Sequence, residues 1–455
     1  MTARLDAKTT PPVVPQPVVA MLTLGCKLNQ AESQVLARQL EDAGCAVIDR
    51  PAPADGFVIN TCTVTHVADR KARHLVRMVK RLSPSAPVVV TGCYAEWAAE
   101  HIAANTGADL VLGNGIKDGA ATRLLGLLSE CGRETRTPEI TGARRRSGRT
   151  RAFIKIQEGC NDVCAFCIVP RVRGRERAVP IPEVVRAAQA REAAGALEIV
   201  LTGTQPGAYG RDRDDGATPA ALIESLLAET TLPRIRYSSI QPQDLTNEFL
   251  QHWADARMCR HFHLALQSGS DAVLGTMRRH YNARQFLAAI QRIRAAVPGA
   301  SITSDVIVGF PGETAHDFQD TVRVAEEAEF SDIHVFPYSQ RPGTGAALRA
   351  DDVPPAIKRE RVSMLRGVAR RGALAFRASL CGTTQAVLFE RGRSGTEGVM
   401  NWSGLTDSYL PVLTRTARSI DLENRLVATR LSGELDGTGV PGALRGRVLE
   451  WPGPS

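Results

Sequence analysis

The chain has 455 residues, which is enough for about three domains of roughly 150 residues each. Its 56 Lys and Arg residues outnumber its 48 Asp and Glu residues, and this mild positive excess favours an anionic partner such as nucleic acid. Ten cysteines are too few for a disulfide scaffold, and their partial crowding suits metal binding in a reducing compartment. No apolar run approaches the roughly 18 residues that cross a bilayer. We therefore expect a cytoplasmic protein without a membrane partner.

Residues 1–17 form a Pro-rich tail that we expect to be disordered. The apolar run that follows, residues 18–26, superficially resembles a lipoprotein signal ending at a cysteine, but the tail before it carries Asp6 and four prolines. We interpret the run as a first buried strand with Cys26 at its end.

Residues 18–141 alternate short apolar runs with amphipathic stretches, which predicts a parallel α/β domain. In open sheets of this kind, ligands bind at the carboxyl ends of the strands. The strands are expected over residues 18–24, 56–60 and 87–91, and the helices over residues 30–43 and 69–82.

Three cysteines, Cys26, Cys62 and Cys93, each follow one of these apolar strands. Strand ends of one parallel sheet share an edge, so the three thiols are able to converge although they are far apart in sequence. Three thiols hold three corners of a [4Fe–4S] cluster and leave one iron open. The alternative is that each cysteine is an ordinary small core residue. The repeated strand-then-cysteine context favours the ligand interpretation.

A basic linker over residues 142–151 lacks apolar periodicity and marks a domain boundary. After it, apolar strands again alternate with helical segments up to about residue 349, which predicts a partial or complete β/α barrel. The expected strands include residues 199–201, 234–238, 263–266, 304–308 and 333–336.

The run from Gly159 to Cys167 contains three thiols, those of Cys160, Cys164 and Cys167, at spacings of four and three. These thiols are suited to hold three corners of a cubane cluster. Its open fourth iron would bind a small molecule in chelate fashion, which indicates catalysis rather than electron transfer alone. A zinc site is the alternative, but it requires a fourth Cys or His, and the next histidine after Cys167 is His252.

The remaining residues predict a basic helix over 358–377, whose simplest interpretation is a solvated face, and then a small β-barrel. Strand signals over residues 385–390 and 409–413 stand between glycine turns. The cysteines that match no ligand motif are interpreted as core or incidental residues; they are Cys45, Cys131, Cys259 and Cys381.

The spacing of Cys160, Cys164 and Cys167, with Phe166 directly before the third cysteine, resembles the radical S-adenosylmethionine (SAM) superfamily. The resemblance implies that SAM chelates the open iron and is cleaved to a 5'-deoxyadenosyl radical, which removes hydrogen from an unreactive C–H bond.

With the three N-terminal cysteines and the C-terminal β domain added, nearly the whole chain resembles the radical SAM methylthiotransferases. The family implies a cluster domain over residues 18–141, a radical SAM barrel over 152–375 and an RNA-binding TRAM β-barrel over 376–451. It also implies two [4Fe–4S] clusters, one to cleave SAM and one to carry the sulfur, with a second SAM as the methyl donor.

The motifs of residues 24–33, 60–65 and 68–71 are similar to the branch that acts on C2 of N6-threonylcarbamoyladenosine at position 37 of tRNA. After the first cysteine this chain has Lys27, Leu28 and Asn29, where the isopentenyladenosine branch usually has Gln-Met-Asn and the ribosomal-protein branch Pro-Lys-Asn. The resemblance thus implies methylthiolation of threonylcarbamoyladenosine 37. The alternatives are isopentenyladenosine 37, a ribosomal-protein aspartate, or a non-catalytic iron-sulfur RNA-binding sensor.

The barrel segments of the family imply SAM contacts. Glycines at strand ends let backbone approach a cofactor, and amide, hydroxyl and carboxylate groups hydrogen-bond it, although the glycines also suit plain turns. The implied cofactor-binding residues are Phe166, Gly203, Gln267, Ser268, Asp305 and Gly309. The chain departs from the usual pattern at Gln241, where Glu is frequent, at Arg171, where Tyr is frequent, and at residues 204–206.

Two groups of arginines are candidates for RNA contacts. Residues 173–177 contain three arginines that would bind tRNA phosphate or the SAM carboxylate, or else form salt bridges at the barrel rim. Arg391, Arg393 and Arg415 of the C-terminal barrel are expected to hold the tRNA anticodon loop. An external electron donor and a sulfur source complete the expected partners.

Overall fold

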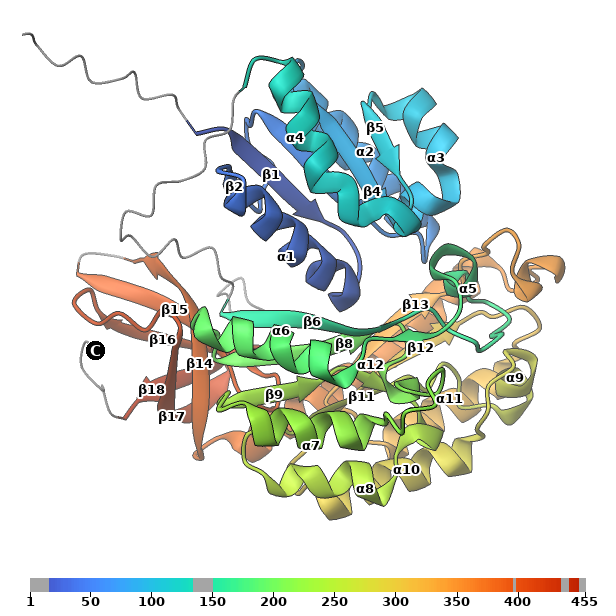
Figure 1. Ribbon diagram of the computed structural model, residues 1–455. Helices are drawn as coiled ribbons and strands as arrows, with labels where there is room; N and C mark the ends of the chain where they lie inside the picture. Colours follow the sequence, from blue (N-terminus) through green and yellow to red (C-terminus); the bar gives the residue numbers. More distant parts are fainter. Residues whose placement is uncertain (1–15, 134–149, 396–397, 435–441, 450–455) are drawn as a thin grey trace, which may run out of the picture. The chain divides into compact units, whose positions relative to one another are not determined.

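The computed structural model describes residues 16–133, 150–395, 398–434 and 442–449 (Figure 1). Except for residues 16–17 and 150–151, the predicted Pro-rich tail and basic linker lie outside these residues, as do residues 450 and 451. The chain forms two compact units. The first contains the described parts of residues 1–24, 33–61 and 69–147, and the second contains residues 25–32, 62–68 and the described residues from 150 onward. No helix in the described ranges is long and apolar enough to span a membrane.

A parallel sheet with the strand order β2-β1-β3-β4-β5 forms the first unit. The strands are β1 (Val18–Thr23), β2 (Ala46–Ile48), β3 (Gly56–Thr61), β4 (Val88–Gly92) and β5 (Leu110–Leu112). The central strands are continuous apolar runs because helices cover both faces of the sheet. This arrangement confirms the predicted parallel α/β architecture.

The helices of the first unit pack on opposite faces of that sheet. They are α1 (Lys27–Asp42), α2 (His66–Leu82), α3 (Cys93–Thr106) and α4 (Ala120–Glu130), with a short 3₁₀ helix, η1 (Asn114–Gly119). Successive residues of a strand point to opposite faces. Accordingly, Val19 and Met21 pack with α1 and α4, and Ala20 and Leu22 pack with α2 and α3.

A partial barrel forms the main part of the second unit. Its two sheets, β7-β6-β8-β9 and β10-β11-β12-β13, continue one another because only Ser238 separates β9 from β10. All pairings are parallel except that of β7. The strands are β6 (Arg151–Glu158), β7 (Arg177–Ala178), β8 (Glu198–Gly203), β9 (Arg234–Tyr237), β10 (Ser239–Ile240), β11 (His261–Leu264), β12 (Ser301–Val308) and β13 (Asp332–Pro337).

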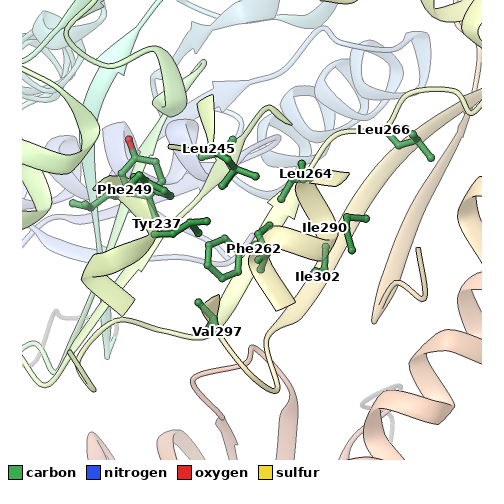
Figure 2. Close-up of a cluster of buried hydrophobic side chains, with 14 of the residues drawn as sticks. Tyr237, Leu245, Phe249, Phe262, Leu264, Leu266, Ile290, Val297 and Ile302 are labelled. Carbon is green, nitrogen blue, oxygen red and sulfur yellow. The ribbon is translucent and has the colours of Figure 1, made fainter. Parts of the chain in front are cut away.

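Helices cover the outside of the partial barrel and close one large apolar core, part of which Figure 2 shows. In that core the ring of Phe249 meets Tyr237 edge-on at 5.1 Å, and Phe262 and Ile302 of neighbouring strands lie near Ile290. The helices are α5 (Val169–Arg173), α6 (Ile181–Ala193), α7 (Pro219–Glu229), α8 (Asn247–Leu250), α9 (Asp271–Thr276), α10 (Ala283–Ala296), α11 (Ala315–Glu327) and α12 (Pro355–Leu380). The predicted β/α barrel is therefore confirmed in its partial form.

The inner face of the barrel is polar and open to solvent. Along β12, Ile302, Ser304 and Val306 are buried, whereas the alternating Thr303 and Asp305 are partly exposed. Along β13 the same alternation buries Ile333 and Val335 and exposes Asp332, His334 and Phe336. Because alternate residues face opposite sides of a strand, the more exposed set lines the lumen.

A closed β-barrel with the strand order β14-β15-β16-β18-β17 follows α12. This confirms the predicted small C-terminal barrel. The strands are β14 (Thr384–Ser394), β15 (Val399–Leu405), β16 (Pro411–Ala417), β17 (Arg425–Glu434) and β18 (Leu444–Val448). Tyr409, predicted to lie in a strand, instead lies in the turn before β16 with φ at 69°.

The charged residues of α12 do not form a uniformly solvated face. Arg361 is buried and hydrogen-bonds Glu313, and Lys358 forms an ion pair of 2.5 Å with Asp351. These pairs attach α12 to the loops that follow β12 and β13 rather than leaving its charges to solvent.

The turn over residues 406–410 is fixed to the partial barrel by three arginines of β9 and the residues before β11. Arg236 Nη1 donates to the Asp407 carbonyl at 2.7 Å, and Arg234 Nη1 donates to the Leu405 carbonyl at 3.0 Å. Arg260 Nε pairs with the Asp407 carboxylate at 2.6 Å. The turn is therefore attached firmly to the barrel strands, and this attachment fixes the position of Tyr409.

Candidate active site

The loop with three cysteines begins where β6 ends. Gly159 has φ at 78°, and a Cβ atom there would lie 1.9 Å from the Arg175 carbonyl oxygen, so only glycine fits. The Cys160 amide then donates to the Gly174 carbonyl at 3.1 Å, and the Cys167 amide donates to the Cys164 carbonyl at 3.1 Å. One bond within the loop and one to Gly174 thus hold the loop at the carboxyl end of a barrel strand.

The thiols of this loop are in surroundings that disfavour a free thiolate. Burial raises the pKa of Cys160 to about 12 and that of Cys167 to about 12, and neighbouring thiols of the same loop add to the rise. A bound metal cluster would offset both effects, because coordination to iron stabilises the thiolate form. None of the described cysteines is in a disulfide.

The three sulfur atoms of the loop do not all lie within 4.8 Å of one another. Among the described residues, only His263, Asp305 and His334 bring three potential ligand atoms within 4.8 Å of one another, so the sulfurs of the cysteine loop lie further apart. Tetrahedral zinc with Zn–S bonds of about 2.3 Å would need its sulfurs only about 3.8 Å apart. Bound zinc would require the sulfurs to lie closer together than they do here, and the cluster interpretation of the loop stays a prediction.

Gln205 provides a second test of the fit. The Cys160 thiol donates to Gln205 Oε1 at 2.8 Å, while Gln205 Nε2 is buried with no hydrogen-bond partner in the described structure. A cluster-bound thiolate needs a donor instead of an acceptor. A rotation of the amide by 180° would turn the unpartnered Nε2 toward the sulfur, so the residue fits a thiolate ligand.

Arg279 is the cationic neighbour of the loop, and no motif in the sequence indicates it. Its Nη1 donates to Cys164 Sγ at 3.2 Å and its Nη2 donates to Gln241 Oε1 at 2.7 Å. Burial opposes its charge, but Tyr281 and Cys164 raise the pKa of Arg279 overall. A fixed positive charge therefore lies against one of the three sulfurs.

Gln241, the departure from the usual glutamate, joins two charged groups of this site. Its Oε1 accepts from Arg279, and its Nε2 donates to Asp162 Oδ2 at 3.1 Å. A carboxylate at this position would accept from Arg279 but would repel Asp162. An amide therefore suits the local arrangement better than a second acid.

Cys26, Cys62 and Cys93 follow the carboxyl ends of β1, β3 and β4, which are neighbouring strands. Cys62 and Cys93 come directly after Thr61 and Gly92, which are paired in the sheet, and both are buried, whereas Cys26 is exposed. A Cβ on Gly25 would lie 2.7 Å from Cys62 Cβ, so the chain beside Cys26 touches Cys62. The topology thus agrees with the predicted edge, and the second cluster stays a prediction.

Buried Arg173 bonds to the first turns of α1, the helix that directly follows Cys26. Its guanidinium donates to Glu32 Oε1 at 2.8 Å and to Asn29 Oδ1 at 2.6 Å, and to Glu158 Oε1 at 2.9 Å. It is 5% exposed. The sequence left open whether the arginines of residues 173–177 bind phosphate or carboxylate ligands or form salt bridges. Arg173 forms salt bridges.

A second buried arginine, Arg341, bonds to the residues that follow Cys62. Its Nη2 donates to Thr63 Oγ1 at 2.8 Å and its Nη1 lies 3.3 Å from His66 Nδ1. The His66 amide also donates to Ser339 Oγ at 3.2 Å. Arg173 and Arg341 thus fix the segments after Cys26 and Cys62 to the barrel residues of the same unit.

The predicted SAM contacts differ in how accessible they are. Gly203 is the last residue of β8. Gln267, which has φ at 64°, donates its backbone amide to the Asp305 carbonyl at 2.8 Å. Both residues therefore lie at carboxyl ends of barrel strands. Ser268 is fully buried, and its hydroxyl lies 3.2 Å from Thr321 Oγ1. Its side chain is therefore engaged with α11, and its contact with SAM stays a prediction.

Gly309 and Phe166 have structural neighbours of their own. Gly309 has φ at 68°, a Cβ there would lie 2.4 Å from Lys358, and its amide donates to Glu313 Oε2 at 2.5 Å. Phe166 packs against the apolar cluster that contains Phe310 and Tyr338. Their contact with SAM stays a prediction.

Asp305 is held by two histidines in the lumen. His263 Nε2 lies 3.3 Å from Asp305 Oδ2, and His334 Nδ1 lies 3.0 Å from Oδ1. Burial opposes ionisation, but these hydrogen bonds prevail and hold the pKa of Asp305 below its usual range, and the bond to Asp305 raises the pKa of His334. An ionised carboxylate is therefore built into the lumen wall.

An aromatic residue with several cations around it lies near the first residues of the barrel strands. The ring of Tyr409 has Lys27 Nζ at 5.2 Å, Arg151 at 5.4 Å and Arg236 at 4.7 Å, and His261 stacks on it at 4.9 Å. We call these five residues the Tyr409 cluster. His261 Nε2 lies 3.2 Å from Thr303 Oγ1, which lies 2.9 Å from His263 Nδ1, so the cluster continues into the lumen.

Two family models and several relatives match the chain. Residues 18–113 match "Uncharacterized protein family UPF0004", and residues 154–325 match "Radical SAM superfamily". The chain is 37% identical over 427 residues to threonylcarbamoyladenosine tRNA methylthiotransferase MtaB of Bacillus subtilis, covering 91% of this chain and 93% of that protein. It is 34% identical over 435 residues to tRNA-2-methylthio-N(6)-dimethylallyladenosine synthase of Moorella thermoacetica, covering 90% and 95%.

The fold is also similar to a solved structure. The radical S-adenosylmethionine methyltransferase TsrM from Kitasatospora setae, solved with cobalamin and a [4Fe–4S] cluster, superposes with a TM-score of 0.51 at 18% identity, covering 73% of this chain and 77% of that one. At this identity the likeness concerns the fold alone.

Proposed function

The chain belongs to the radical SAM methylthiotransferase family, and we propose that it adds a methylthio group to C2 of N6-threonylcarbamoyladenosine at position 37 of tRNA. The MtaB proteins of Bacillus subtilis and Thermotoga maritima, at 37% and 35% identity, carry that activity in their names. The dimethylallyladenosine synthases match almost as well. The choice between the two tRNA substrates is therefore our proposal.

Six cysteines would hold the two clusters, with Cys160, Cys164 and Cys167 for the radical SAM cluster and Cys26, Cys62 and Cys93 for the second. When bound, the first cluster with SAM supplies the one-electron chemistry that an unreactive aromatic C–H bond requires, and the second supplies the sulfur. No side-chain base removes the C2 hydrogen of adenine, so the protein's own residues act by binding and orientation.

The observation that carries the proposal is the pair of buried arginines. Arg173 reaches Asn29 and Glu32, close after Cys26, and Arg341 reaches Thr63, directly after Cys62. An enzyme that only cleaves SAM would not need to fix these two segments to the barrel. A sulfur donor has to be held where the activated carbon is formed, because geometry supplies much of the rate of such a step.

Other residues of the chain hold a positive charge at the loop of Cys160 to Cys167. Arg279 places its guanidinium at Cys164 Sγ and is itself held by Gln241 and Tyr281. Hydrogen bonds and charge at cluster sulfurs tune the reduction potential. Arg279 and Gln241 are therefore positioning residues for the radical SAM cluster.

The C-terminal barrel provides an exposed basic face for tRNA. Arg393, Asn401 and Arg415 are opposite one another on three adjacent strands, and Arg415 Nε donates to Asn401 Oδ1 at 3.2 Å. Arg391 lies two residues from Arg393 on the same side of β14. Such a row suits backbone phosphates, while the target base leaves a single-stranded loop to reach the lumen.

Deletion of the gene in the source organism tests the proposal. We expect the 2-methylthio form of threonylcarbamoyladenosine to disappear from digested tRNA, with its unmodified parent accumulating, as measured by mass spectrometry. Wild type should restore it, and Cys62→Ala and Cys164→Ala should not. Loss of the 2-methylthio dimethylallyl nucleoside instead, with threonylcarbamoyladenosine unaffected, would assign the chain to the other substrate.

A further inference from the structure

We propose that Lys27, with the Tyr409 hydroxyl beside it, forms an anion site in the barrel lumen that binds the carboxylate of the threonyl group on the target base. The inference rests on the proposed function and deepens it, because it names the residues that select a substrate bearing an amino-acid carboxylate.

Lys27 is partly buried and lacks an anionic partner. Within the described chain, its Nζ is in contact with the Tyr409 ring at 5.2 Å and makes no hydrogen bond or ion pair with a carboxylate. Withdrawing an ammonium from water without a partner is unfavourable, and an aromatic face compensates only in part. The position is therefore suited to a ligand that carries a negative charge.

The carboxylates near Lys27 are already engaged with other cations. Arg236 Nε pairs with Glu198 Oε1 at 2.8 Å, and Arg151 Nε pairs with Glu390 Oε1 at 2.5 Å. Each of these acids therefore has a guanidinium partner of its own. The three cations of the Tyr409 cluster, which are Lys27, Arg151 and Arg236, therefore outnumber the two acids that pair with them, Glu198 and Glu390.

Two polar atoms of the cluster are able to complete the anion site. The Tyr409 hydroxyl accepts a hydrogen bond from Arg151 Nη1 at 3.2 Å, which leaves its own hydrogen for donation. His261 is 3% exposed, and its Nδ1 is a buried atom with no hydrogen-bond partner among the described residues. An anion beside Lys27 would find a hydroxyl donor and an imidazole within the same cluster.

The backbone of Tyr409 supports a functional role. Its φ of 69° lies in the left-handed region, which is unfavourable for a bulky residue and is maintained only where the surroundings impose it. The Tyr409 amide donates to the Thr406 carbonyl at 3.1 Å, and the Leu410 amide donates to Thr406 Oγ1 at 3.0 Å. The turn thus holds the ring under Lys27 at a conformational cost.

The site lies on the surface that a substrate in the lumen would meet. Burial and then the charge of Lys27 lower the pKa of His261, and the same charge opposes the rise that Asp305 causes in the pKa of His334, so Lys27 lies near the lumen wall. His334 and Thr303 on that wall are accessible to solvent. The Watson–Crick edge of adenine carries both C2 and N6, so a base held for reaction at C2 presents its N6 substituent to the same cavity.

The test compares two forms of one tRNA, one with threonylcarbamoyladenosine at position 37 and one with the methyl ester of the same group. For wild type we expect the ratio of kcat/KM, acid over ester, to be about tenfold or more, as loss of a charge-assisted hydrogen bond predicts. In Lys27→Gln the ratio of kcat/KM, acid over ester, should approach one. Lys27→Arg should keep most of the wild-type preference for the acid. Tyr409→Phe, which keeps the ring, should lower it severalfold.

Lys27 neighbours Cys26, so the iron and sulfide content of each variant and its SAM cleavage without tRNA serve as controls for intact clusters. Equal wild-type rates on acid and ester, or a Lys27→Gln variant that keeps the wild-type ratio, would overturn the anion site. If Lys27→Gln does not load its clusters, the test uses Tyr409→Phe instead. An acid-to-ester ratio of kcat/KM that stays at the wild-type value in Tyr409→Phe would then overturn the anion site. A wild-type enzyme that acts on neither form but on the dimethylallyl tRNA would instead overturn the proposed function.

Discussion

The two sets of cysteines differ in how the chain brings them together. Cys160, Cys164 and Cys167 lie within eight positions of one loop, which has an internal backbone bond and is also bonded to Met277 and Ala346 through Ala165. Cys26, Cys62 and Cys93 come from three strand ends, and two buried arginines outside the sheet fix the segments after the first two. The first set is a local motif, whereas the second depends on topology and distant contacts. Chemistry on SAM alone should therefore tolerate changes that stop the transfer of sulfur.

The largest expected effect separates the two sets directly. Cys164→Ala should abolish both SAM cleavage and methylthiolation, because it would remove one of the three proposed ligands of the radical SAM cluster. Cys62→Ala should abolish methylthiolation while SAM cleavage continues. Both are measured by chromatography of 5'-deoxyadenosine and of the modified nucleoside. Loss of SAM cleavage in Cys62→Ala, with the first cluster intact by its spectrum, would contradict the division of roles.

The second effect concerns the buried ion pairs that fix α1. Arg173→Met leaves Glu32 and Glu158 buried with less compensation, and breaking such a network costs about 3–5 kcal/mol of unfolding free energy. Denaturant unfolding under anaerobic conditions measures it. Arg177→Met is the matched control, because Arg177 is exposed and lies 3.9 Å from Glu158, and it should change stability little. Equal free energies of unfolding for the two variants would show that Arg173 does not stabilise the fold.

The third effect concerns the charge at Cys164. Arg279→Gln removes a cation from a cluster sulfur, so the radical SAM cluster should become harder to reduce and SAM cleavage should slow by about tenfold. A redox titration followed by electron paramagnetic resonance measures the potential. Arg278→Gln, at the exposed neighbouring residue, is the control. A potential that stays at the wild-type value in Arg279→Gln would show that the guanidinium does not tune the cluster.

The smallest effect concerns the C-terminal barrel. Arg393→Gln should weaken tRNA binding severalfold and reduce the slope of log affinity against log salt by about one, as removal of one phosphate contact predicts. Filter binding over a range of salt concentrations measures both quantities. Arg186→Gln on α6, also exposed, should leave the slope unchanged. Identical slopes for the two variants would place the RNA contact elsewhere.

The sequence predicted features that depend on local pattern or on strand order. The loop of Cys160 to Cys167 is predictable from the sequence because its proposed cluster ligands are three and four residues apart. The placement of Cys26, Cys62 and Cys93 at strand ends is predictable because the apolar strands of a parallel sheet end on one edge. The division into domains stays a prediction, since the partial barrel and the C-terminal barrel belong to one compact unit.

The residues that the sequence did not reveal act through long-range contacts. Arg279 is 115 residues from Cys164 and no motif connects them. Lys27 meets Tyr409 only because arginines of the barrel fix the turn after β15. The sequence predicts Tyr409 in a strand, since an aromatic residue beside Leu410 favours that state, whereas the turn bonds of Thr406 decide its backbone. Tertiary contacts, which periodicity does not encode, determine these positions.

The most direct test of the central claim is a reconstituted reaction with two tRNAs in competition, one with threonylcarbamoyladenosine and one with dimethylallyladenosine at position 37. The enzyme would carry both clusters, with SAM and a chemical reductant present, and mass spectrometry would report both 2-methylthio nucleosides. We expect the threonylcarbamoyl product to form in large excess in the wild type and neither product to form in Cys62→Ala. Preferential formation of the dimethylallyl product would contradict the substrate assignment, and formation of either product by Cys62→Ala would contradict the role of the second cluster.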